Sequence, residues 1–146
     1  MKTYVTTPDR KRYIFYPAPS NKQFQFKICC SNDCHVALTT EPQEYHPIYE
    51  VVIGGWNSTK SVIRYGGKQP DVAITATPNI VNTNEMRGFW IRWRDQTISV
   101  GREGEATAFM SYKDAQLFDV KFLGICTAYG SMGSWLFDGD RDNYNF

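Results

Sequence analysis

Apolar and polar residues alternate along much of the chain with a period of two. Between residues 23 and 28, Phe24, Phe26 and Ile28 alternate with glutamine and lysine. This alternation is typical of a β-strand that buries one face. Further runs of strand length recur at intervals of roughly 8–12 residues, separated by Gly, Pro, Asn or Asp. The expected strands, about ten in number, cover residues 23–28, 34–38, 49–56, 60–65, 72–76, 88–94, 97–101, 106–112, 118–128 and 134–137.

No stretch of the chain shows a convincing helical period, and no internal repeat or linker interrupts the strands. Residues 1–22 hold only a short apolar stretch at 13–16, which Pro17 ends. A chain of 146 residues with 42% hydrophobic content is long enough for one domain with its own core. We therefore expect a single all-β domain over residues 1–146, an antiparallel β-sandwich or jelly roll.

The charge balance argues against two classes of partner. The chain has 16 basic and 15 acidic side chains, a net charge of +1, and so lacks the basic excess of a nucleic-acid or membrane-surface protein. No apolar run approaches the roughly 18 residues of a membrane span. No apolar run follows Lys2 either, so we expect no secretory leader in this chain. The protein is cytoplasmic as the sequence stands, or extracellular if a leader was removed or secretion is leaderless.

The four cysteines do not have the spacing of a disulfide scaffold. Cys29, Cys30 and Cys34 lie close together, whereas Cys126 is remote. Buried free thiols are favoured over a Cys30–Cys34 bridge, and the redox state stays open. A zinc site built from these three cysteines and His35 is disfavoured, because adjacent residues of a strand point to opposite faces. We expect no metal site here.

The C-terminal tail contains alternating acids at Asp138, Asp140 and Asp142, as in a calcium loop. However, Asn143 stands where such a loop has glycine, and no glutamate follows to complete it. A solvated acidic tail is the favoured interpretation, and calcium binding stays an open alternative.

Four motifs occur in order along the chain. They are Gly54–Gly55–Trp56 with Asn57, Ser61, Ile63 and Arg64; residues 88–93 (GFWIRW); residues 98–101 (ISVG) with Gly104 and Glu105; and Gly124, Tyr129, Gly130, Gly133 and Trp135. Together they resemble the domain family named after farnesoic acid O-methyltransferase, over roughly residues 24–137. The resemblance implies a β-sandwich found alone or beside lectin-like modules in invertebrate proteins.

The sequence departs from that family pattern at two places. Ser134 stands where the family often has an acidic residue before the final tryptophan, and Cys34 and Cys126 stand where small residues are common. The first departure argues against an acidic ligand-binding group at position 134. The resemblance also implies that the methyltransferase label belongs to a fold that does not look like one.

Signs of an enzyme are weak. A methyltransferase that uses S-adenosylmethionine usually has a glycine-rich turn between a parallel strand and a helix, whereas Gly54 and Gly55 lie in a hairpin pattern. The two histidines, His35 and His46, accompany no Gly-x-Ser-x-Gly motif. Solvated or salt-bridged roles suffice for Glu50, Glu103 and Glu105. We expect no catalytic residue and no cofactor, with a farnesoic acid O-methyltransferase-like enzyme as the alternative.

Aromatic side chains are abundant, at 15% of the chain, and several stand beside polar groups. An indole stacks on the apolar face of a sugar ring, and guanidinium donors match hydroxyl and carboxylate oxygens. Period two places Trp90 on one face of its strand with two arginines, opposite the core residues, and the hairpin and glycine turns expose other aromatics. The candidate ligand-binding residues are Trp56, Asn57, Arg64, Trp90, Arg92, Arg94, Tyr129 and Trp135.

These residues predict a lectin, a non-enzymatic protein that recognises glycans, with a galactose-type sugar as one candidate. A homo-oligomer would give weak single sites avidity. A protein–protein interaction module that uses the same aromatic face is a further alternative. Asn57–Ser58–Thr59 is also an N-glycosylation sequence, which matters only if the protein is secreted.

Overall fold

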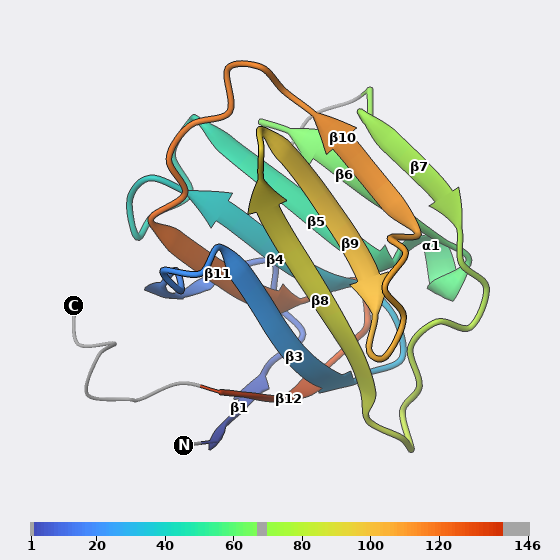
Figure 1. Ribbon diagram of the computed structural model, residues 1–146. Coiled ribbons are helices and arrows are strands. Elements are labelled where there is room, and N and C mark those ends of the chain that lie inside the picture. The colour runs from blue at the N-terminus through green and yellow to red at the C-terminus, as the bar shows by residue number, and fades with distance from the viewer. Residues whose placement is uncertain (1, 67–69, 139–146) are drawn as a thin grey trace.

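Two antiparallel β-sheets pack face to face in the computed structural model, which describes residues 2–66 and 70–138 (Figure 1). Each sheet has six strands in these ranges. In spatial order the first sheet contains β1 (Lys2–Thr7), β12 (Gly133–Asp138), β3 (Gln23–Cys29), β8 (Arg87–Arg94), β9 (Thr97–Arg102) and β10 (Met110–Lys113). The second contains β2 (Ile14–Pro17), β11 (Phe122–Thr127), β4 (Cys34–Thr39), β5 (Ile48–Gly54), β6 (Lys60–Tyr65) and β7 (Ala73–Ala76). The predicted all-β sandwich is confirmed.

The core lies between the two sheets and follows the alternation seen in the sequence. In β3, Phe24, Phe26 and Ile28 are buried while the residues between them are not. The ring of Phe26 lies 5.4 Å from that of Trp135 on β12, centroid to centroid. From the second sheet, residues such as Val51 project into the same cluster. Burial of this large apolar surface is the main force that holds the sheets together.

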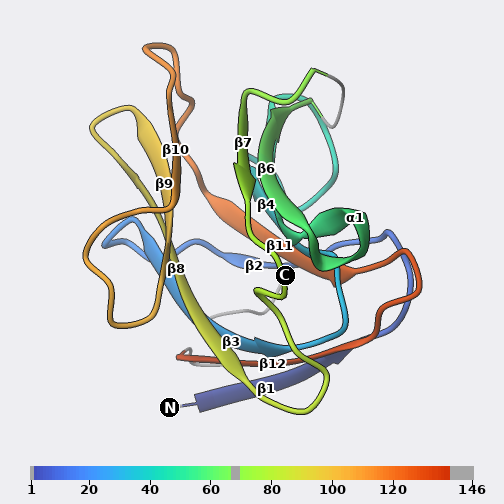
Figure 2. The same ribbon diagram turned by 90° about the vertical axis from the view of Figure 1, so that its right-hand side faces the viewer.

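The outer face of the second sheet is the surface that positions the candidate site. Cross-strand pairing places His35 of β4 beside Val52 of β5, Val52 beside Val62 of β6, and Val62 beside Ile74 of β7. Figure 2 shows α1 (Gly55–Ser58) on the side of this sheet that faces away from the first sheet. The turn at the tip of the β5–β6 hairpin therefore lies over the outer face of the second sheet.

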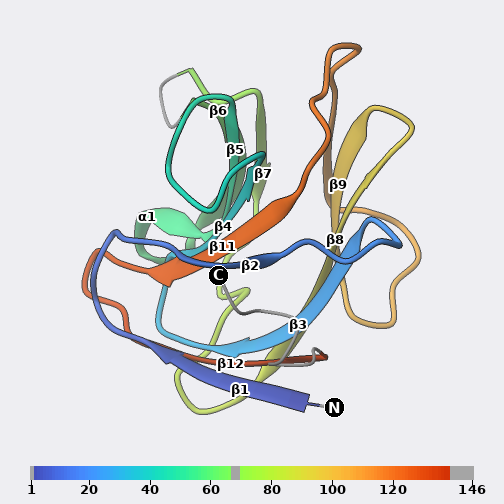
Figure 3. The same ribbon diagram turned by 90° about the vertical axis from the view of Figure 1, so that its left-hand side faces the viewer.

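The segment between β1 and β2 crosses from the first sheet to this face of the second (Figure 3). Its Arg10 amide donates to the carbonyl of Thr127 at 2.9 Å, which anchors the segment beside the end of β11. Further along, Tyr13 packs with Ala37 and Cys126 in a small second cluster. The segment covers one part of the outer face and leaves the part near α1 uncovered.

Several strands differ from the sequence-based prediction: the apolar stretch at 13–16, which was not counted as a strand, overlaps β2, and the strand expected over residues 118–128 begins only at Phe122. Strand β1 was not predicted, because Thr3 and Thr7 take two of its inward positions and Val5 between them is the one apolar residue on that face. The strand expected over residues 106–112 begins only at Met110. The amide of Phe109 still donates to the carbonyl of Val100 at 2.9 Å, so the chain approaches β9 before the strand begins.

All four cysteines are free, and Cys30, Cys34 and Cys126 are buried whereas Cys29 is half-buried. Burial raises the pKa of Cys30 and of Cys126 to about 12, so these thiols stay protonated at neutral pH. In the acidic tail, Asp138 pairs with Lys2 at 3.2 Å, whereas Asp140 and Asp142 lie outside the described residues. Across 2–66 and 70–138, no helix is long and apolar enough to cross a membrane.

Candidate functional site

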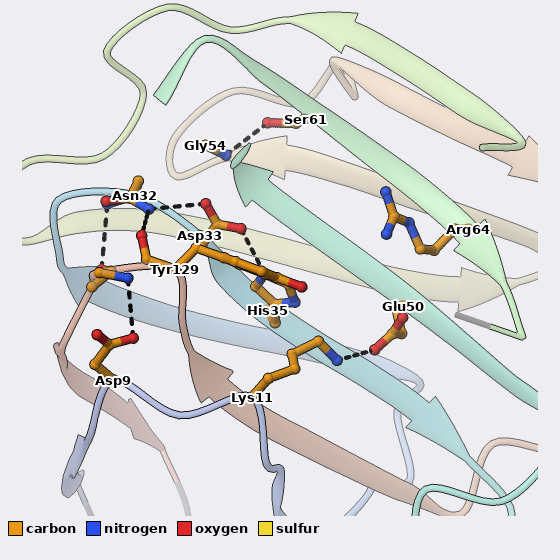
Figure 4. A network of polar contacts seen from close by, with 12 residues as sticks. Asp9, Lys11, Asn32, Asp33, His35, Glu50, Gly54, Ser61, Arg64 and Tyr129 are labelled. Atoms are coloured by element: carbon orange, nitrogen blue, oxygen red, sulfur yellow. Dashed lines mark hydrogen bonds and ion pairs between the residues drawn. The ribbon is translucent and has the colours of Figure 1, made fainter. Parts of the chain in front are cut away.

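A pocket of about 420 Å³ opens on the outer face of the second sheet, beside α1. Strands β4, β5 and β6 form its floor, and three loops form its walls. Figure 4 shows how the polar side chains of this region converge. The residues that line the pocket are Asn32, Asp33, His35, Val52, Trp56, Asn57, Arg64 and Tyr129.

One wall is a left-handed turn that presents Trp56 and Asn57. Gly54 begins it with φ 70°, and Trp56 and Asn57 follow with φ 49° and 61°. For a non-glycine residue the left-handed conformation costs roughly 1–2 kcal/mol. The Gly54 amide donates to Ser61 Oγ at 3.1 Å, and the Thr59 hydroxyl donates to the Trp56 carbonyl at 2.7 Å. These bonds hold a turn that its own backbone preference disfavours.

Backbone strain gathers around the pocket. Within the described ranges, nine non-glycine residues have positive φ, and four of them line this pocket: Asp33 (51°), Trp56 (49°), Asn57 (61°) and Tyr129 (56°). Strained backbone of this kind is typical of functional sites, where side chains must be held in one orientation. Because four of these nine residues line one pocket, we take the pocket as the candidate functional site.

Two aromatic rings stand at the rim of the pocket. Trp56 is 42% exposed and Tyr129 is 70% exposed, which is high for such large apolar side chains. The Tyr129 ring centroid lies 6.0 Å from that of His35, so the tyrosine leans over the floor. Exposed rings beside a polar floor are suited to stacking against a ligand.

A hydrogen-bond network joins the floor to the Tyr129 loop (Figure 4). His35 Nε2 lies 2.9 Å from Asp33 Oδ2, and because a carboxylate only accepts, Nε2 carries the hydrogen. The side-chain amide of Asn32 donates from Nδ2 to Asp33 Oδ1 at 2.9 Å and to the Tyr129 carbonyl at 3.1 Å. At the same loop, the Gly130 amide donates to Asp9 Oδ1 at 3.1 Å. Residues far apart in the sequence are thereby fixed in one wall.

On the opposite side of the pocket, cationic side chains surround the indole. Arg64 Nε donates to Asp71 Oδ1 at 3.0 Å, and its guanidinium carbon lies 5.5 Å from the centroid of the Trp56 ring. Lys60 Nζ lies 4.2 Å from the same ring. Both contacts are cation–π interactions that restrain the indole.

A buried ionic cluster lies next to the pocket on the same face. Glu50 Oε1 accepts from Lys11 Nζ and from Tyr13 Oη, each at 2.6 Å. Burial by itself raises the pKa of Glu50, but the bonds and charge supplied by Lys11 and Tyr13 outweigh it, and the pKa lies below the ordinary value. Burial and the Glu50 charge raise the pKa of Tyr13. Glu50 is therefore ionised at neutral pH.

Replacing Glu50 by glutamine is expected to reduce the free energy of unfolding at pH 7 by about 2 kcal/mol, because charged hydrogen bonds are lost. The pKa of Glu50 is lower in the folded state than in the unfolded state. Its contribution is therefore complete above the unfolded-state pKa and is lost as pH falls through the folded-state pKa. Urea unfolding of both proteins between pH 7 and pH 3 should show the difference shrinking in acid. A difference that stays constant with pH would contradict this assignment.

The structure brings together Trp56, Asn57, Arg64 and Tyr129, four of the residues proposed from the sequence. The other four lie elsewhere. Trp135 is 0% exposed and donates from Nε1 to Thr7 Oγ1 at 2.9 Å, so its indole belongs to the core.

Trp90 is 4% exposed, and its indole nitrogen donates to the carbonyls of Arg102 and Glu105 at 3.1 and 2.9 Å. The guanidinium of Arg92 lies 4.0 Å above that ring, and Arg94 Nη2 donates to the Asn21 carbonyl at 2.8 Å. These three residues pack on the first sheet, away from the pocket.

Sequence reasoning missed Asn32, Asp33, His35 and Val52 as pocket residues. The alternation of side chains along β4 gave one signal for His35. Because Val36 faces the core, its neighbour His35 must face outward. Within the described ranges, no group of three or more His, Cys, Asp or Glu side chains is placed to hold a metal ion.

A comparison of the sequence with known protein families agrees with the resemblance that the four motifs indicated. The sequence profile of the family described as farnesoic acid O-methyl transferase matches residues 9–141. The chain belongs to this farnesoic acid O-methyltransferase domain family. The match begins before the region 24–137 inferred from the motifs, and so includes the segment that crosses the outer face of the second sheet. No curated protein matches the chain in sequence.

Three solved structures share the fold of this family member at low sequence identity. A lichenase, a β-1,3-1,4-glucanase derived from a mouse hindgut metagenome, has a TM-score of 0.53 and 12% identity, over 94% of this chain and 79% of its own. Bacillus licheniformis β-glucanase has a TM-score of 0.52 and 11% identity, over 95% and 79%. The exoplasmic/lumenal domain of VIP36, in a Ca²⁺/Man3GlcNAc-bound form, has a TM-score of 0.56 and 8% identity, over 95% and 85%. At these identities the comparison shows the shared fold alone.

Proposed function

We propose that this domain is a lectin that binds glycans, without catalysis, in the pocket beside α1. One observation carries the proposal: two exposed aromatic rings, Trp56 and Tyr129, stand on strained backbone beside a floor with imidazole and guanidinium groups and walls with amide groups. Sugar sites need this combination, because a sugar ring has apolar C–H faces and hydroxyl edges. The shared fold of the VIP36 domain, which is solved with Man3GlcNAc, is compatible with the proposal.

In this mechanism the indole of Trp56 stacks on one face of the sugar, and Tyr129 closes over it from the opposite wall. The Asn57 amide and the Arg64 guanidinium bind hydroxyl oxygens. Because the left-handed turn is already ordered, the pocket spends little conformational entropy on binding. A homo-oligomer would present several such pockets and raise the avidity of weak single sites.

The arrangement of strands also favours binding over methyl transfer. Every strand pair within the described residues is antiparallel. A nucleotide-type cofactor usually rests on a glycine-rich turn that connects a parallel strand to a helix. Measurable binding of S-adenosylmethionine would favour the enzyme alternative.

The test replaces both rim aromatics with asparagine, a residue that tolerates positive φ and so preserves the turns. Trp56→Asn and Tyr129→Asn should each weaken binding to any glycan found on an array by at least about tenfold, or about 1.4 kcal/mol. Titration calorimetry measures the change. Tyr45→Asn is the matched control, because Tyr45 is also highly exposed but does not line the pocket.

Tyr45→Asn should leave the affinity unchanged. If the wild-type protein bound no sugar at millimolar concentration, or if the two rim variants bound as tightly as the control, the lectin assignment would be wrong.

A further inference from the structure

We infer that the ligand carries an anionic oxygen group, so that the pocket selects acidic glycans such as uronates over neutral sugars. The inference rests on the proposed function and adds the class of sugar to it. It follows from an imbalance in and beside the pocket: both oxygens of the lining carboxylate already accept hydrogen bonds, whereas the terminal nitrogens of Arg64 and the ammonium of the neighbouring Lys60 have no ion-pair or hydrogen-bond partner among the described residues.

Asp33 is the carboxylate that lines the pocket, and both of its oxygens are occupied. Oδ2 accepts from His35 Nε2 at 2.9 Å, and Oδ1 accepts from the Asn32 amide at 2.9 Å. Its side chain is also buried. Each oxygen of Asp33 already accepts one hydrogen bond and the side chain is buried, so this acid is less available to a ligand hydroxyl than an exposed carboxylate would be.

Arg64 is in the opposite situation. Its Nε is bound to Asp71, but neither terminal nitrogen has a hydrogen-bond partner among the described residues. Figure 4 shows the Arg64 side chain extended over the sheet, with no hydrogen bond drawn between its guanidinium and Glu50. The side chain is only 18% exposed and the buried Asp71 holds it in place. Such a fixed fork matches the two oxygens of a carboxylate or sulfate group.

Lys60 adds a second cation at the same place. Its Nζ and the Arg64 guanidinium both lie over the Trp56 ring, at 4.2 and 5.5 Å from the centroid. Lys60 has no ion pair within 2–66 and 70–138. Asp71 offsets the charge of Arg64, whereas the charge of Lys60 has no such partner, so an anion bound near the Trp56 ring would gain the attraction of an unpaired cation.

A sugar that stacks on Trp56 would place a ring substituent near both cations. A hydroxyl group there would gain ordinary hydrogen bonds, whereas a carboxylate or sulfate would gain charge-assisted bonds, which are about twice as strong. The site therefore favours a sugar acid, and the same contacts suit a sulfate ester on a sugar.

The test compares three methyl glycosides by titration calorimetry at low salt: methyl galactoside, methyl galacturonide and the 6-sulfate of methyl galactoside. At least one of the two anionic sugars should bind about tenfold more tightly than the neutral sugar. Raising the salt concentration from 0.05 to 0.5 M should reduce this preference, because salt screens exposed charges. The uronide and sulfate arms distinguish the two sources of the anion.

Two variants locate the preference. Arg64→Lys keeps the charge beside Asp71 but removes the fork, and Lys60→Met keeps an apolar stem over the indole without the charge. Each should reduce the ratio of the anionic-sugar affinity to the neutral-sugar affinity several-fold, because a charge-assisted bond loses more than an ordinary hydrogen bond does. Lys113→Met is the matched control, because Lys113 is exposed on β10 and, unlike Lys60, does not lie over the Trp56 ring.

The possible outcomes separate this inference from the proposed function. If the neutral sugar binds as tightly as both anionic sugars, the pocket is a lectin site but the inference is overturned. The inference is also overturned if Lys113→Met reduces the preference as much as Lys60→Met does. If none of the glycosides and no glycan on an array binds, the proposed function fails and the inference fails with it.

Discussion

Replacing Trp135 by alanine is expected to lower the free energy of unfolding by about 3–5 kcal/mol. The indole is fully buried between the sheets, packs against Phe26, and donates a hydrogen bond to Thr7 Oγ1. Alanine would leave a cavity at the centre of the core and remove the partner of a buried hydroxyl. Because domains of this size are stable by about 5–15 kcal/mol, the variant should be close to unfolding. Urea unfolding followed by circular dichroism measures the loss.

Trp135→Phe is the control for this prediction. Phenylalanine retains most of the apolar volume and loses only the indole hydrogen bond, so the loss should be clearly smaller than with alanine. If Trp135→Ala were as stable as the wild type but had lost glycan binding, Trp135 would be a ligand residue and its place in the core would be wrong.

Gly101→Ala is expected to destabilise the protein by about 3 kcal/mol, the upper part of the range for overpacking. A methyl group at Gly101 would lie 2.1, 2.2 and 2.7 Å from three atoms of the Trp90 indole. The indole has little freedom to move away, because its nitrogen is bound to two carbonyl oxygens and Arg92 lies over its face. Thermal and urea unfolding of the variant measure the cost.

A double variant tests whether the contact with Trp90 is the cause. In Trp90→Leu the smaller side chain makes room for the methyl group, so adding Gly101→Ala to it should cost much less than in the wild type. The coupling between the two sites should therefore exceed 1 kcal/mol, as is common for residues in contact. Additive effects of the two substitutions would contradict the packing described here.

The strands of the core could be predicted from the sequence because burial imposes its period of two directly on residues such as Phe24 and Phe26. Strand β1 could not, because Thr3 and Thr7 fill its buried positions and the single Val5 between them is too weak a signal. The turn at Asp95–Gln96 was predicted between two strands, and both residues have the positive φ that a tight hairpin requires.

The candidate site was predicted in part, for a physical reason. The aromatic residues in turns, Trp56 and Tyr129, are exposed because their backbones force them outward. Trp90 shares a strand face with Arg92, but the sequence does not show that Gly101 on the neighbouring strand allows the indole to lie flat and become buried. The alternation of side chains along a strand predicts which face a residue lies on, but it does not predict which other groups cover that face.

The other pocket residues depend on contacts between distant parts of the chain. Asn32 reaches the Tyr129 carbonyl across 97 positions of sequence, and Asp9 reaches the Gly130 amide across 121. No local pattern encodes either contact. The sandwich topology alone brings these loops to the same end of the second sheet, and so creates a site that neither loop could form by itself.

The left-handed turn at Gly54–Ser58 limits how this surface could diversify. Residues with branched β-carbons are strongly disfavoured at positions 56 and 57, since φ is positive there, whereas asparagine, aspartate and glycine are accommodated. A library that varies position 57 among such small residues, and leaves Gly54 and Ser61 intact, should yield folded proteins with altered preferences. Randomising the whole hairpin tip should mostly yield proteins in which it no longer has a fixed shape.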